Sequence, residues 1–193
     1  MKKFFVMVVL ALLFALPASA EVILSEVMAS NGVYTNGEAY DWVEIHNPGK
    51  SRVDLSGCFL SDSEKDLCKW AFPEGTAIKG GEYLLVYLTG EKMAPGKNKT
   101  FYANFKISAE GDQLFLTDKE GNLLAEMAFG PQFGNVSYGI AGEEWGFFAA
   151  ATPGKKNEKQ VYPGRAETPE ILTPGGFYAQ GVTVQAKAPG NAV

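Results

Sequence analysis

Apolar and polar residues alternate along much of the chain with the period of two that is typical of β-strands. Within residues 40–46, Val43 and Ile45 alternate with Glu44 and His46. This spacing places the two pairs on opposite faces of one strand. No segment after residue 20 shows a helical period over three turns. The pattern therefore predicts a chain built from strands.

Turn-forming residues separate these short apolar segments at intervals of about 8–15 residues, which is typical of a β-sandwich or a small barrel. The segment 82–88 is almost wholly apolar, which predicts a central strand. Residues 118–121 predict a hairpin turn. The predicted strands span residues 21–29, 40–46, 53–55, 57–60, 68–72, 82–88, 113–117, 122–129, 136–140 and 145–148.

The first twenty residues have a different pattern. Lys2 and Lys3 precede an apolar run over residues 4–16, and the small residues 18–20 follow. This order predicts a secretory signal peptide that is cleaved before Glu21. The alternative is an uncleaved anchor, but the run is shorter than the roughly 20 residues that a membrane span needs. We therefore expect a secreted protein, extracellular or associated with the cell surface.

Composition narrows the class of protein. The chain has 193 residues, of which 46% are hydrophobic, and this excludes a disordered chain. The net charge of −5 argues against a partner held by general attraction to anions, such as nucleic acid. A single histidine excludes sites that need two.

The composition changes near Thr152. Residues 153–170 are polar and rich in proline, which predicts a domain end and a linker. The segment after them is too short to bury a core of its own. We therefore expect a signal peptide at 1–20, a first domain at 21–158 that folds alone, a linker at 159–168 and an incomplete β-module at 169–193.

Six motifs in order carry a resemblance to a known family over about residues 22–157. They are VILSEVMASNG, DWVEIHNPG, VDLSGCFLSD, WAFPEGTAIKGGEYLLVY, FKISAEGDQLFLTDKEGNLLAEMAFG and TPGKKN. Together they resemble the lamin tail domain, an immunoglobulin-like module that also occurs in secreted bacterial proteins. The resemblance implies an all-β, immunoglobulin-like sandwich. Cys58 departs from the family pattern, which more often has an aromatic residue after LSG.

Residues 169–188 resemble the opening of a chitobiase C-terminal-like β-sandwich, which often follows a lamin tail domain in secreted proteins. These resemblances imply a non-catalytic binding or scaffolding module, with no catalytic, cofactor-binding or metal-binding residues. The partner is a glycan, an envelope protein or a downstream domain of a longer chain. One alternative is the N-terminal part of a larger secreted enzyme (a spore-coat-H-like kinase, a nuclease or a hydrolase) with its catalytic domain beyond residue 193. The other is a calcium-dependent adhesin.

Two groups of acidic residues are candidate chemical sites. Glu44 and His46 share a strand face while Asp41 points to the other, and we interpret them as a solvated or hydrogen-bonded face without a substrate cleft. Asp62, Glu64 and Asp66 alternate as calcium ligands do, but Leu67 stands where the calcium loop needs glycine. That segment predicts a charged turn.

Aromatic residues supply the candidate ligand surface. Tyr34 and Tyr40 flank the first loop, and Phe101 and Tyr102 lie among lysines. Such rings can stack on a sugar or a base. The alternative is a loop with a solvated fringe of lysines.

Cys58 and Cys68 are the only cysteines, and export would allow a disulfide to persist. A hairpin centred on Ser63 would place them directly opposite one another. We therefore predict a Cys58–Cys68 disulfide, against the alternatives of two reduced thiols or a shifted register.

Overall fold

In the computed structural model of the protein, the described residues are 22–32, 39–96 and 100–188. All regular elements within these ranges are β-strands. None of these residues forms a helix long and apolar enough to cross a membrane. The predicted signal peptide, residues 1–20, lies outside the described residues.

The larger sheet consists of β1 (Ile23–Met28), β2 (Asp41–His46), β7 (Tyr83–Leu88), β8 (Phe101–Ala103), β11 (Tyr138–Ala141) and β12 (Glu144–Phe147). Their order across the sheet is β12-β11-β1-β2-β7-β8. A second sheet contains β4 (Phe59–Ser61), β5 (Trp70–Ala71), β9 (Asp112–Thr117) and β10 (Leu123–Phe129) in the order β10-β9-β4-β5. Two short pairs complete the set, β3 (Val53–Asp54) with β6 (Ala77–Ile78) and β13 (Glu170–Ile171) with β14 (Ala186–Lys187).

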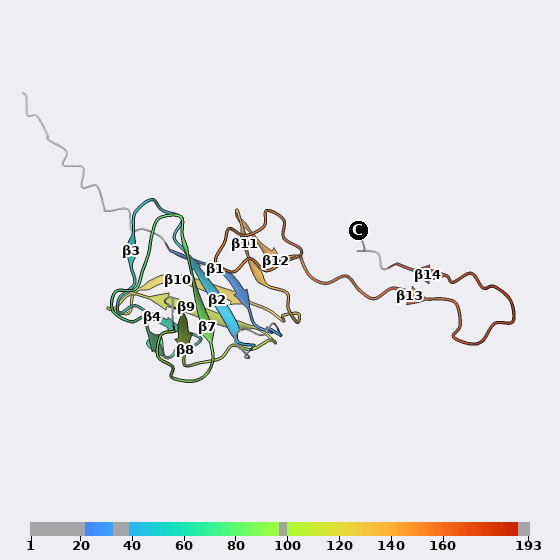
Figure 1. Ribbon diagram of the computed structural model, residues 1–193, viewed down its shortest axis with the longest axis horizontal. Coiled ribbons are helices and arrows are strands. Elements are labelled where there is room, and N and C mark those ends of the chain that lie inside the picture. Colours follow the sequence, from blue (N-terminus) through green and yellow to red (C-terminus); the bar gives the residue numbers. More distant parts are fainter. Residues whose placement is uncertain (1–21, 33–38, 97–99, 189–193) are drawn as a thin grey trace, which may run out of the picture.

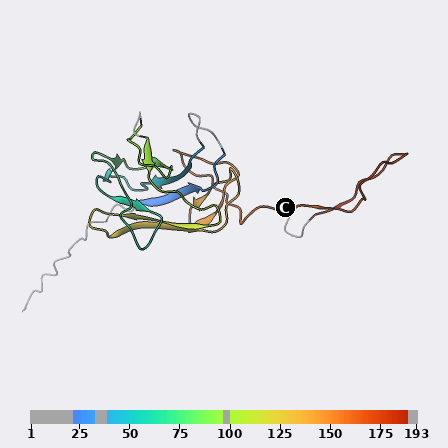
Figure 2. The same ribbon diagram turned by 90° about the horizontal axis from the view of Figure 1, so that it is seen from below.

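The two larger sheets form two layers around one apolar core (Figures 1 and 2). Val43 and Ile45 of β2 point into this core without exposed surface, and Leu114 and Leu116 of β9 meet them from the other sheet. The alternation in the sequence therefore identifies the inner face of each strand. The all-β, immunoglobulin-like sandwich expected from the sequence is the observed fold.

All ten strands predicted between residues 21 and 148 overlap an observed strand, and two unpredicted ones complete the sheets. Strand β7 lies between β2 and β8, as expected for an apolar central strand. The turn between β9 and β10 closes with a hydrogen bond from the Gly121 amide to the Asp118 carbonyl (3.0 Å), and Gly121 has a φ of 85°. Strands β6 and β8 are missing from the prediction. Strand β8 pairs in parallel with β7, whereas the other pairs in this sheet are antiparallel.

The register between β4 and β5 corrects the predicted disulfide. Leu60 pairs with Trp70, so the hairpin is centred on Lys65 rather than Ser63. The Phe72 amide donates to the Cys58 carbonyl (2.8 Å), so Phe72 rather than Cys68 lies across from Cys58. Both cysteines are free thiols, Cys58 buried and Cys68 exposed.

The predicted register was wrong because the polar turn is longer than expected. The Ser61 hydroxyl donates to the Asp66 carbonyl (2.5 Å), and this bond closes a wide turn before the strands pair. Burial raises the pKa of the Cys58 thiol, and nearby carboxylates such as Asp118 add to the rise. Cys58 therefore packs in the core as a small apolar side chain.

The predicted linker begins against the sandwich. Tyr162 forms an antiparallel bridge to Phe147 on the edge of β12, with two backbone hydrogen bonds of 2.9 Å. Gly146 makes room for this segment, because a Cβ atom there would lie 2.8 Å from the Tyr162 carbonyl oxygen and from Val161 Cβ. The packed unit therefore extends beyond the predicted boundary at residue 158.

Residues 170–187 form a short hairpin from β13 and β14 (Figure 1). Its apolar side chains are exposed, including Ile171, Phe177 and Val184. An isolated two-stranded hairpin is marginally stable in water. The resemblance of this segment to a chitobiase C-terminal-like module stays a prediction.

Two truncations test where the folded unit ends. Removing residues 166–193 should change the free energy of unfolding by no more than about 0.5 kcal/mol, because the described side chains of this segment, residues 166–188, are almost all exposed. Removing residues 160–193 also deletes the two hydrogen bonds at Phe147 and should lower the free energy of unfolding by about 1–3 kcal/mol. Urea denaturation of both truncations against the parent chain measures this, and equal stability of the two would show that the bridge contributes nothing.

Candidate functional site

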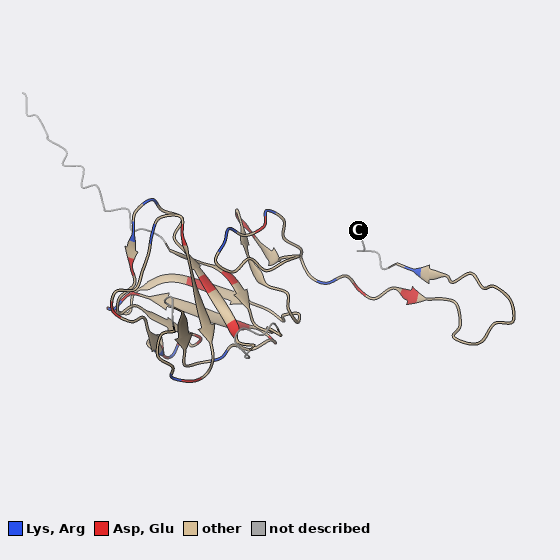
Figure 3. Ribbon diagram, in the orientation of Figure 1, with Lys and Arg blue, Asp and Glu red and all other residues tan. Residues whose placement is uncertain are grey.

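Two glutamates lie side by side in the middle of the larger sheet. Glu26 of β1 pairs directly with Glu44 of β2, and neither side chain has exposed surface. Acidic positions therefore mark the centres of both strands in Figure 3. A β-bulge at Ser25 adds one residue to β1, so that Ser25 and Glu26 both reach the outer face of the sheet. Buried carboxyl groups of this kind require hydrogen-bond donors.

The donors come largely from residues 150–159, which we call the strap because they cross the outer face of the sheet. Thr152 donates its amide (3.0 Å) and its hydroxyl (2.8 Å) to the Glu26 carboxyl group, and the Gly154 amide donates to Glu44 Oε2 (2.5 Å). The hydroxyl groups of Ser137 (2.5 Å to Glu26) and Ser25 (2.8 Å to Glu44) complete the set. Each of the four carboxyl oxygens accepts at least one hydrogen bond.

The sequence Thr-Pro-Gly-Lys gives the strap its shape. The Lys155 amide donates to the Thr152 carbonyl (3.0 Å), with Pro153 and Gly154 between them. Gly154 has a φ of 75°, as the third residue of a type II turn requires. The amide of that third residue is not used inside the turn, so it is free to donate to Glu44.

The carboxyl pair has an unusual charge state. Burial raises the pKa of Glu44 to about 7, and the neighbouring Glu26 carboxyl adds to the rise, while hydrogen bonds from Ser25 and Gly154 oppose it. Glu44 therefore keeps its proton to a higher pH than an exposed glutamate does. A proton on one of two facing carboxyl groups removes most of the repulsion between them.

A second anchor fixes the far end of the strap. The Asn157 side-chain amide donates to the Ser25 carbonyl (2.9 Å) and to the Ile140 carbonyl (3.0 Å). Beside it, the rings of His46 and Tyr83 stack across β2 and β7 with centroids 4.1 Å apart. The strap, the ring pair and the end of β11 therefore enclose a space between them.

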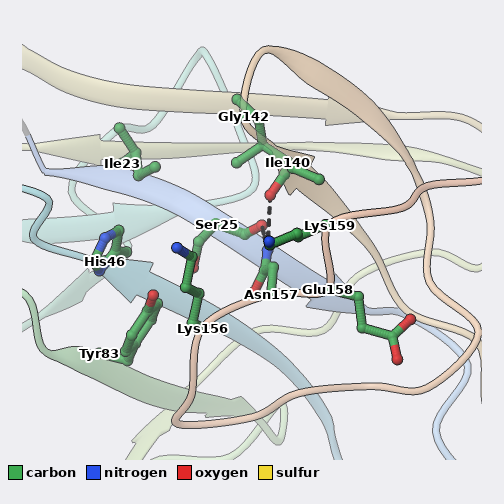
Figure 4. A pocket seen from close by; sticks show the side chains of 11 residues that line it. Ile23, Ser25, His46, Tyr83, Ile140, Gly142, Lys156, Asn157, Glu158 and Lys159 are labelled. Atoms are coloured by element: carbon green, nitrogen blue, oxygen red, sulfur yellow. Dashed lines mark hydrogen bonds between the residues drawn. The ribbon is translucent and has the colours of Figure 1, made fainter.

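This space is a pocket of about 440 Å³, which we call the strap pocket. Figure 4 shows its floor of Ile23, His46 and Tyr83, which come from three neighbouring strands. The strap forms one wall, and the turn between β11 and β12 forms the other. The residues that line the pocket are Ile23, Ser25, His46, Tyr83, Ile140, Ala141, Gly142, Lys156, Asn157, Glu158 and Lys159.

On the other side of the strap, three tyrosines form a cluster that we call the tyrosine face, made of Tyr40, Tyr87 and Tyr102. Tyr87 and Tyr102 stack with centroids 5.9 Å apart, and Tyr40 meets both rings edge-on at 6.5 Å. All three side chains are half-buried. Tyr87 also lines a groove of about 350 Å³ that runs along β7 to Gly154.

The structure brings together two of the four predicted ligand-surface residues. Tyr40 and Tyr102 belong to the tyrosine face, and the sequence interpretation missed Tyr87. Phe101 is a correction, because its ring is only 5% exposed and packs in the core against Trp70 and Phe72. Neighbouring residues on β8 alternate between faces, so Phe101 and Tyr102 cannot both face outward. Tyr34 lies outside the described residues.

Two of the three acidic candidates in the charged turn have structural partners. Asp62 forms an ion pair with Lys69 (2.5 Å), and Asp66 accepts a hydrogen bond from the Cys68 amide. Over residues 22–32, 39–96 and 100–188, no group of three or more His, Cys, Asp or Glu side chains is placed to hold a metal ion. Glu44 and His46 share the outer face and both are hydrogen-bonded, as expected. His46 also lines the strap pocket, whereas the sequence interpretation expected no cleft beside it.

Sequence reasoning missed Glu26 and its partner Thr152. The available signal was a glutamate in the middle of each of two apolar strands, EVILSEVMA and DWVEIH. A charge with apolar neighbours on both sides in a buried strand needs a specific partner. The position of that partner, more than a hundred residues away, follows from the fold.

The family model of the Lamin Tail Domain matches residues 16–131. The match covers more than half of the chain. No curated protein matches the chain.

The raised pKa of Glu44 predicts how stability depends on pH. In the unfolded chain, Glu44 loses its proton above its ordinary pKa of 4.5, whereas in the folded chain it keeps the proton up to a pH of about 7. Because the folded state binds more protons in this range, the free energy of unfolding should fall as the pH rises from about 5 to 8. At about 1.4 kcal/mol per pKa unit, the fall is about 3 kcal/mol. Glu44→Gln should abolish most of this slope, while Glu82→Gln, at an exposed site, should retain it. Urea denaturation across this pH range measures the slope, and an unchanged slope in Glu44→Gln would contradict the assignment.

Proposed function

This chain belongs to the lamin tail domain family, and we propose that it is an exported, non-catalytic binding module that holds a saccharide polymer against its tyrosine face. The immunoglobulin-like fold of the family fits a binding or scaffolding role. The proposal names the surface that performs this role and the chemistry of its partner.

The main support for this proposal is the arrangement of the three rings in the tyrosine face. Tyrosine rings combine an apolar face, which packs against the C–H groups of a sugar ring, with a hydroxyl that hydrogen-bonds to sugar hydroxyls. Tyr87 belongs both to the cluster and to the groove along β7, so the two surfaces adjoin at this residue and can both contact an extended chain. The net charge of −5 favours a neutral partner over a polyanion at this open surface.

The state of the two glutamates supports a non-catalytic role. A pair of carboxyl groups is the arrangement that glycoside hydrolysis uses, with both groups facing the substrate. Here Glu26 and Glu44 have no exposed surface, and the strap supplies their donors. Their chemistry serves to hold the strap on the sheet.

Export rests on the N-terminal sequence. Lys2 and Lys3, the apolar run and the small residues at 18–20 match the order of a secretory signal peptide. A role at the cell surface or in an extracellular assembly follows from that expectation.

Pull-down with insoluble neutral polysaccharides, such as xylan, β-glucan and galactan, tests the tyrosine face. The chain should be retained on at least one of them, and the double substitution Tyr87→Ala with Tyr102→Ala should reduce retention at least tenfold, because it removes both stacked rings. Trp145→Ala is the matched control, since Trp145 is an exposed ring on β12 at the opposite edge of the sheet. Retention equal to that of the parent chain in a folded double variant would refute the proposal.

Export has its own test. Expressed from its own N-terminus in a secreting bacterial host, the chain should be recovered outside the cytoplasm with Glu21 as its first residue. N-terminal sequencing and intact mass measure this. Recovery of Met1 on protein from the cytoplasm or from washed membranes would contradict it.

A further inference from the structure

The strap pocket differs in chemistry from the open tyrosine face. Its volume of about 440 Å³ lies within the range of small-ligand sites. Ile23, Ile140 and Ala141 supply its apolar surface. Its polar groups come from the stacked rings of His46 and Tyr83, which we call the ring pair, and from the strap. A few polar groups between apolar walls are the usual composition of a site that orients a small ligand.

Two cations line this pocket in a chain whose net charge is negative. Lys156 and Lys159 both belong to the strap. Neither ammonium group has an ion-pair partner within the described part of the chain. Figure 4 shows the Lys156 side chain extending toward the ring pair and the Glu158 carboxylate extending away from it. The strap therefore supplies positive charge on one side of the pocket, where an anionic group could be held.

The ring pair adds directional hydrogen bonds. His46 Nδ1 lies 3.1 Å from the Glu82 carbonyl oxygen, and because a carbonyl only accepts, Nδ1 carries the proton. Nε2 is then left to accept from a ligand hydroxyl. Burial, with the nearby Glu44 carboxyl, raises the pKa of Tyr83, so its phenol stays protonated and can donate.

The position of the pocket favours a sugar over a peptide terminus. Extended peptides that bind a β-sheet through their main chain add a strand to an exposed edge. The floor of the strap pocket lies on β1, β2 and β7, and each of these strands has a neighbour on both sides. A ligand here meets side chains on a sheet face, which suits a ring with hydroxyl groups and one carboxylate.

We propose that the strap pocket binds a uronic acid residue of an acidic saccharide, with its carboxylate held by Lys156 and its hydroxyl groups by His46 and Tyr83. The proposal rests on the proposed saccharide-binding role but concerns a separate site, so either can fail alone. The buried glutamates contribute indirectly, because they hold the strap that carries the lysines.

Isothermal titration of the purified chain with galacturonate and glucuronate trimers tests the proposal. At least one trimer should bind, and its methyl ester and the corresponding neutral trimer should bind at least tenfold more weakly. Lys156→Met should weaken binding of the acid trimer at least tenfold, because it removes a charge-assisted hydrogen bond and keeps the apolar stem. Lys119→Met, in the turn between β9 and β10, should leave the affinity unchanged.

Three results would overturn the proposal: no heat with either acid trimer up to millimolar concentration, equal affinity for ester and acid, or unchanged affinity in Lys156→Met. The double substitution Tyr87→Ala with Tyr102→Ala separates the two proposals. It should lose retention on neutral polymers while keeping the affinity for the acid trimer. Simultaneous loss of both activities in this folded variant would show that the pocket is not a separate site.

Discussion

The fold depends on satisfying two carboxyl groups that the sheet buries. Glu26 and Glu44 face each other at the centre of the larger sheet, where water does not reach them. An unsatisfied buried carboxyl group costs several kcal/mol, which is a large part of the stability of a domain of this size. The strap removes that cost with amide and hydroxyl donors from Thr152 and Gly154. The six-stranded sheet and the strap are therefore one structural unit.

This arrangement also determines the surface on which the proposed ligands lie. The strap crosses the sheet and divides its outer face into the strap pocket and the tyrosine face. The residues that position the strap, such as Asn157 and Gly154, also border the pocket and the groove. The hydrogen bonds that hold the strap on the sheet therefore also shape the two proposed binding surfaces. A substitution in the strap is expected to affect both stability and binding.

The sequence predicted the fold class and the longer strands because their residues alternate with a clear period, as Val43 and Ile45 do. It did not predict β8, because three residues are too few to show a period, and so Phe101 was assigned to the surface. The register at Cys58 depends on the length of the polar turn after β4. Hydrogen bonds at Ser61 determine that length. The contact between Glu26 and Thr152 joins residues 126 positions apart, and only the completed topology reveals it.

That sequence separation has a consequence for the order of folding. The first two strands depend on a segment more than a hundred residues later in the chain, so their central carboxyl groups have no strap donors until residue 154 has been synthesised. Contacts between distant segments also slow folding, because the loop between them must close first. A stable sandwich is therefore not expected before the strap has been synthesised. The carboxyl pair therefore ties the stability of the first two strands to a segment that the ribosome adds more than a hundred residues later.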